Sequence, residues 1–125
     1  MRQALLESIQ TREDVTLVSL ANAAGGQSIC SLSRGPIPVP AVKYHEGAAA
    51  ALAEARRAVR SVPDGPDAPA AVRSAILDIC ESWRAQSRSP GRSGPSWTGY
   101  LAGGVDVLEQ MIEDYAGRRE HDGQD

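Results

Sequence analysis

The sequence is poor in aromatic residues and in lysine. Its 125 residues contain no Phe, two Trp and three Tyr, and Lys43 stands alone beside twelve arginines. Nineteen alanines are present, so the core has to be built from Ala, Leu, Val and Ile. Alanine is the best helix former, and its small side chain lets helices approach closely. The composition predicts closely packed helices, and its Arg and Ala bias is typical of bacterial proteins from GC-rich genomes.

Cysteines and long apolar runs are also scarce. Cys30 and Cys80 fit no metal-binding or redox spacing, so we expect structural thiols, with Cys80 buried. No apolar run approaches the roughly 18 residues of a membrane span, and the N-terminal stretch with Glu7 does not resemble a signal peptide. The net charge of −3 gives no global attraction to nucleic acid or anionic lipid. We therefore expect a cytoplasmic protein without membrane contact, metal or cofactor.

The length predicts a single domain, because about 125 residues can bury roughly two thirds of the surface exposed by the unfolded chain. We expect one helical domain over residues 1–117 and a polar tail over 118–125. The fold class is mainly α, a bundle of four to five helices. A proline-containing extended segment is expected over about 27–43, where a short β element is an alternative.

Three helices are predicted in the latter two thirds of the chain, over residues 45–60, 68–86 and 96–116. Apolar residues recur there every three or four positions, as one face of an amphipathic helix requires. Asp67 and Ser96 are expected to cap the second and third of these helices. The predicted core-facing residues are Ala48, Leu52, Ala55 and Val59, then Val72, Ile76, Ile79, Cys80 and Trp83, then Leu101, Val105, Leu108, Ile112 and Tyr115.

Two glycines interrupt the last of these helices. Gly103 and Gly104 each cost a helix interior about 1 kcal/mol relative to alanine. A helix that keeps both needs a packing reason for them. We expect another helix, or the proline-containing segment, to approach closely at this point.

The N-terminal third is predicted with alternatives. Residues 2–10 suit a short helix, and Thr11 is placed to cap a second one. Residues 15–24 suit a helix better than a strand, although the β-branched run from Val15 leaves both open. Three prolines then exclude regular helix over residues 33–47, where Val42 is one of the apolar contacts expected.

The stretch from Thr16 to Gly25 resembles the first half of a phage-repressor-type helix-turn-helix. Four positions match its pattern of small, apolar and turn residues: Leu20, Ala21, Ala24 and Gly25. The second half departs from the pattern, because Gly26, Ser31 and Arg34 occupy positions where apolar residues are expected. If residues 11–35 bound DNA, the base or phosphate contacts would come from Gln27, Ser28 and Arg34.

Other polar groups give no catalytic set. His45 and Glu46 are adjacent, so on a helix their side chains diverge, and a capping or interface role is expected. The acidic residues of the last helix, and the arginines at 84, 88 and 92, are expected to be solvated. No phosphate-binding loop, nucleophile elbow or HExxH motif is present, so we do not expect an enzyme.

The expected function is binding of another macromolecule, as a small regulatory or accessory protein. Aromatic residues concentrate where proteins contact one another, and the last helix begins with two of them. Its predicted partner interface consists of Trp97, Tyr100, Gly103 and Gly104. The partner is another protein or a second copy of the chain. The alternative is a DNA-binding regulator that uses residues 11–35.

Overall fold

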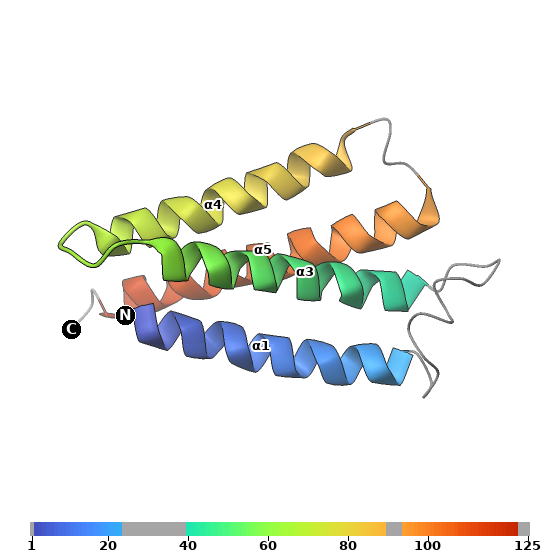
Figure 1. Ribbon diagram of the computed structural model, residues 1–125, viewed down its shortest axis with the longest axis horizontal. Coiled ribbons are helices and arrows are strands. Elements are labelled where there is room, and N and C mark those ends of the chain that lie inside the picture. Colours follow the sequence, from blue (N-terminus) through green and yellow to red (C-terminus); the bar gives the residue numbers. More distant parts are fainter. Residues whose placement is uncertain (1, 24–39, 90–93, 123–125) are drawn as a thin grey trace.

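The computed structural model describes residues 2–23, 40–89 and 94–122 (Figure 1). This part of the chain forms four helices and no strand: α1 (Arg2–Ala23), α3 (Pro40–Ser61), α4 (Ala68–Ser87) and α5 (Pro95–Asp122). The predicted all-α bundle is confirmed. None of these described helices combines the length and the apolar character that crossing a membrane would need.

The bundle is centred on two helices that run in the same direction. Figure 1 shows α3 and α5 running from right to left, and α1 and α4 running the opposite way. The contact between α3 and α5 is the most extensive of the bundle, while α1 packs mainly on α3, and α4 packs on α5 and α3. The parallel pair α3–α5 is therefore the centre, and α1 and α4 flank it.

The core follows the predicted apolar faces closely. All four predicted residues of α3 are buried, as are Val72, Ile76, Cys80 and Trp83 of α4. On α5, Leu101 and Leu108 are buried, and the other three predicted residues are half-buried. Val107 and Met111, which lie beside the predicted stripe, are buried as well. Cys80 is a free thiol, as expected, and its burial raises its pKa.

Two glycines let α3 and α5 touch through their backbones. A Cβ placed on Gly47 would overlap the carbonyl oxygen of Tyr100 and lie 2.6 Å from its carbonyl carbon. A Cβ on Gly103 would overlap the carbonyl oxygen of Tyr44, 2.7 Å from the carbonyl carbon. Both helices carry the same Tyr-x-x-Gly pattern, so each glycine faces the tyrosine backbone of the other helix. The packing reason predicted for Gly103 is therefore α3.

Of the one or two helices expected at the N-terminus, a single one forms, and the break predicted at Thr11 is wrong because α1 is continuous from Arg2 to Ala23. The Thr11 hydroxyl does not cap a second helix but donates to the carbonyl oxygen of Glu7 at 3.0 Å, one turn earlier. Long-range ion pairs hold the middle of the helix: Arg12 pairs with Asp114, and Glu13 pairs with Arg56 at 2.7 Å. Because residues 15–23 are part of this continuous helix, the strand alternative is excluded for them.

The extended segment is wrong for residues 40–47, which belong to α3. Pro40 stands at the start of this helix, where a missing N–H removes no helical hydrogen bond. The helical turn that follows places Val42 in a small cluster with Leu20 of α1, with only 1% of its surface exposed. Residues 27–39, for which the extended segment or a short β element was also predicted, lie outside the described residues.

The predicted boundaries of α4 and α5 need smaller corrections. Asp67 occupies the N-cap position of α4, but its side chain makes no capping hydrogen bond. The last helix begins at Pro95 instead of being capped by Ser96, and it continues through Gly117 to Asp122. Most of the predicted polar tail therefore has a helical backbone.

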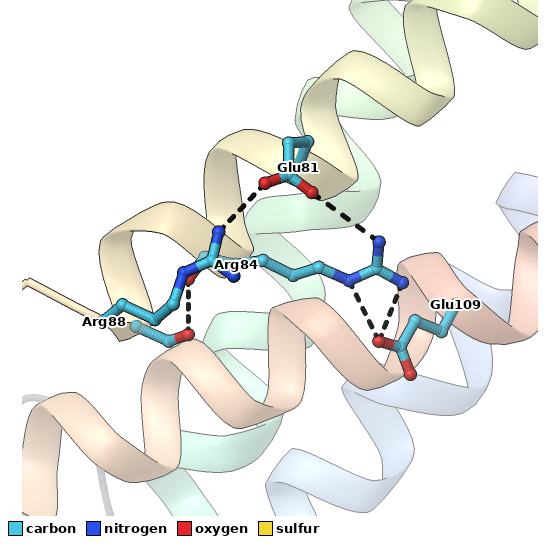
Figure 2. A network of polar contacts seen from close by, with 5 residues as sticks. Glu81, Arg84, Arg88 and Glu109 are labelled. Atoms are coloured by element: carbon cyan, nitrogen blue, oxygen red, sulfur yellow. Dashed lines mark hydrogen bonds and ion pairs between the residues drawn. The ribbon is translucent and has the colours of Figure 1, made fainter.

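The acidic residues of α5 are not simply solvated, because three of them contact other helices. Asp106 accepts a hydrogen bond from the hydroxyl of Tyr44 at 2.6 Å, and Asp114 pairs with Arg12 of α1. Glu109 accepts from Arg84 of α4 at 3.0 Å (Figure 2). The polar side of α5 thus connects it to each of its three neighbours.

Candidate functional site

An open pocket of about 400 Å³ lies where the start of α3, the end of α4 and the start of α5 meet. Figure 1 shows α4 diverging from α3 toward this end of the bundle. Three helices line the pocket, with Lys43, Glu46 and Glu54 from α3, Trp83 and Gln86 from α4, and Trp97 and Tyr100 from α5. Its volume lies in the range typical of ligand sites. We call this site the aromatic pocket.

Trp83 forms the buried part of the aromatic pocket, and Gly104 makes room for it. A Cβ on Gly104 would overlap the indole ring, with Cδ2 of Trp83 only 2.9 Å away. The indole stacks on Tyr100, with ring centroids 5.5 Å apart and an interplanar angle of 28°. Its N–H donates to Oε2 of Glu54 at 3.0 Å, which satisfies the polar atom of a side chain that is 5% exposed.

Trp97 forms the outer edge of the aromatic pocket. Its ring meets Tyr100 edge to face, with centroids 6.0 Å apart and an interplanar angle of 89°. Trp97 keeps 40% of its surface exposed, whereas Tyr100 is half-buried between the two indoles. The three rings therefore run from the core to the surface, with the Trp97 indole at the surface end.

The charges of the aromatic pocket do not cancel. Lys43 Nζ lies 3.2 Å from Oε2 of Glu46, so these two charges largely offset each other. Glu54 makes no ion pair with any described residue, and its only hydrogen bond in that part of the chain comes from Trp83. The lining thus carries a formal charge of −1, from three charged side chains of which two are paired.

The structure separates the four predicted interface residues into two groups. Trp97 and Tyr100 lie together in the aromatic pocket. Gly103 and Gly104 are both buried, Gly103 against the Tyr44 backbone and Gly104 against the Trp83 ring that lines the pocket. Gly104 thus makes room for one wall of the pocket, and neither glycine lines it.

Trp83, Glu54 and Gln86 line the pocket but were not singled out from the sequence as functional residues. Trp83 fits the apolar stripe of its helix and was assigned to the core, which is correct but incomplete. Glu54 lies off the apolar stripe of α3 and carries no motif. A buried indole N–H usually requires an acceptor, which is the signal that could have prompted a search for such a residue.

The residues predicted to contact DNA, Gln27, Ser28 and Arg34, lie outside the described residues. Within residues 11–23 the one basic side chain is Arg12, and it pairs with Asp114. The large apolar side chains exposed in this stretch are Val15, Leu17 and Val18. The described part of the predicted DNA-binding region therefore offers phosphates no unpaired cation.

The Lys-Tyr-His-Glu-Gly stretch at 43–47 makes contacts within the bundle. The hydrogen bond to Asp106 is the main cause that raises the pKa of Tyr44 to about 12, and burial and the Asp106 charge act in the same direction. His45 meets the Tyr44 ring edge to face, with centroids 5.4 Å apart. Through the Tyr44–Asp106 hydrogen bond, this stretch connects α3 to α5. Among the described residues, no group of three or more potential metal ligands is found.

Two of the arginines predicted to be solvated, Arg84 and Arg88, form a network with Glu81 of α4 and Glu109 of α5 (Figure 2). Glu81 lies 2.9 Å from Arg88 and 3.8 Å from Arg84, which also donates twice to Glu109. These groups are between 41% and 67% exposed, so the network contributes no more than about 1 kcal/mol per pair. Arg92 lies outside the described residues.

Comparison of the chain with protein-family models, with curated proteins and with solved structures gives no match, so the aromatic pocket itself is the basis for assigning a function.

Proposed function

We propose that the protein is a cytoplasmic, non-enzymatic helical module that binds a protein partner at the aromatic pocket. The observation that carries this proposal is the position of three of its five aromatic residues, Trp83, Trp97 and Tyr100, around one open pocket. Tryptophan and tyrosine are enriched among the residues that dominate the free energy of protein–protein binding. An indole that is 40% exposed beside such a pocket is an anchor for a partner side chain.

The test is affinity capture from native lysate with two matched variants. Trp97→Ala removes the exposed indole, whereas Leu77→Ala removes a side chain of the same 40% exposure on another part of the surface. We expect Trp97→Ala to lose a partner that the wild-type protein and Leu77→Ala both retain. Retention of every captured protein by Trp97→Ala would refute the proposal. Light scattering on the same variants shows whether the partner is a second copy of this chain.

DNA binding through residues 11–35 remains the alternative function, with no supporting observation in the described residues. The capture experiment separates the two, because a DNA-binding protein copurifies with nucleic acid that absorbs at 260 nm. Binding of random duplex DNA at micromolar concentration, weakening steeply with salt, would favour the alternative.

A further inference from the structure

We infer that the aromatic pocket receives the side chain of an arginine from the partner protein. This inference rests on the proposed function and specifies its chemistry. It is carried by the combination of one uncompensated carboxylate, Glu54, with the indole and phenol rings of Trp97 and Tyr100 in the same pocket.

The charge of the pocket favours a cation. Glu54 is half-buried, accepts one hydrogen bond from the Trp83 N–H, and has no cationic partner within the described residues. When a partner covers the pocket, water leaves, and a carboxylate without a cation would then lose its hydration without replacement. A ligand of charge +1 removes this penalty and neutralises the lining. The Lys43 ammonium does not oppose it strongly, because Glu46 lies 3.2 Å away.

The rings of the pocket also favour a cation, and a planar one. The faces of tryptophan and tyrosine carry negative electrostatic potential and attract ammonium and guanidinium groups within about 6 Å. Trp83 and Tyr100 stack on each other, whereas the Trp97 side chain, which contacts Tyr100 edge to face, is 40% exposed. A guanidinium group can stack on an indole and donate two hydrogen bonds to one carboxylate, which a compact ammonium group cannot do.

Other occupants fit less well. A phosphate or an acidic side chain would meet the negative charge of Glu54 directly. An apolar side chain would bury that carboxylate without compensation. Arginine is the side chain that satisfies both the carboxylate and the aromatic surface.

The pocket contains its own reporter, because both tryptophans of the protein line it. We would titrate the protein with acetyl-glycyl-arginyl-glycine amide and follow tryptophan fluorescence at low salt. The control peptide replaces arginine with citrulline, which has nearly the same shape and no charge. We expect saturable binding of the arginine peptide and at least tenfold weaker binding of the citrulline peptide.

The matched protein variants are Glu54→Gln and Glu113→Gln. Glutamine at 54 keeps an oxygen that can accept the Trp83 N–H bond, so it removes the charge with little change in shape. Glu113 is exposed on α5 and outside the aromatic pocket, so its variant controls for the loss of one negative charge from the protein. We expect Glu54→Gln to bind the arginine peptide at least tenfold more weakly and Glu113→Gln to bind it as the wild type does.

Equal binding of the two peptides, or an unchanged affinity in Glu54→Gln, would overturn the inference. Tetramethylammonium that competes as strongly as the arginine peptide would also overturn it, because the pocket would then bind small organic cations instead of a guanidinium side chain. If Trp97→Ala loses the captured partner but the wild-type protein does not bind the arginine peptide, this inference alone is wrong and the proposed function stands. Arginine binding with unchanged capture in Trp97→Ala would instead refute the proposed function and leave the chemistry of the pocket standing.

Discussion

The contact between α3 and α5 leads to the sharpest prediction, which concerns Gly103→Ala. In an isolated helix this change is favourable by about 1 kcal/mol, because alanine has the higher helix propensity. In the bundle, the new Cβ would lie 2.7 Å from the carbonyl carbon of Tyr44 and overlap the oxygen. The carbon alone needs about 0.7 Å more room to reach ordinary contact at 3.4 Å, so the two helices must move apart.

The size of the effect follows from what has to move. Overpacking that side chains can absorb typically costs about 1–3 kcal/mol, and here the obstacle is backbone that has no other rotamer. We therefore take the upper end, about 3 kcal/mol, and subtract about 1 kcal/mol of helix propensity. The expected net loss of unfolding free energy is about 2 kcal/mol, or roughly 6–10 °C in Tm for a domain of this size.

The assay is urea unfolding followed by circular dichroism at 222 nm. Ala102→Gly on the same helix serves as a control, because it should lose about 1 kcal/mol from propensity alone. The double variant Gly47→Ala with Gly103→Ala should cost less than the sum of the single changes, since helices already pushed apart leave room for the second Cβ. A Gly103→Ala protein as stable as the wild type would refute the proposed backbone contact.

Three further predictions concern single contacts. The pKa of Tyr44 is raised to about 12, so the contribution of its protonated hydroxyl to the free energy of unfolding is complete below pH 10 and is lost as the pH rises toward 12. Tyr44→Phe should therefore show a smaller loss of unfolding free energy over this pH range. Glu13→Gln leaves the half-buried guanidinium of Arg56 without its anion and should cost about 1 kcal/mol in urea unfolding, an effect that unchanged stability would exclude. Val18→Ser alters a side chain that is 61% exposed and should stay within about 0.5 kcal/mol of the wild type, whereas Leu20→Ala should lose at least about 2 kcal/mol. Similar thermal shifts for these last two variants would contradict the orientation of α1.

Local patterns were enough to predict the helices of the latter two thirds. The spacing from Ala48 to Val59 defines a buried face regardless of what packs on it, and all four of its apolar residues are buried. The glycine pair in α5 also predicted a close approach, because glycine in a helix interior is unfavourable unless something uses the space. The identity of the helix that packs on Gly103, α3, could not be predicted from the sequence, because it depends on the arrangement of the whole bundle.

Local patterns misled at the N-terminus. Thr11 satisfies the chemistry of a cap, but a threonine hydroxyl can equally donate to the carbonyl oxygen four residues earlier, as it does here. The partners that hold the helix straight through this point are more than forty residues away in the chain. The same limit applies to the aromatic pocket, where Trp97 and Tyr100 are near neighbours but Glu54 reaches Trp83 only through the fold.

The attachment of α1 to a single principal neighbour has a consequence for how the molecule opens. The contacts of α3 with α5, and of α4 with both, involve no residue of α1. Release of α1 would therefore expose the side of α3 that it covers and leave α3, α4 and α5 together, with the glycine contacts between α3 and α5 unchanged. Such a partial opening requires less free energy than global unfolding. Amide protons of α1 should therefore exchange with deuterium first, and those around Leu52 and Leu108 last.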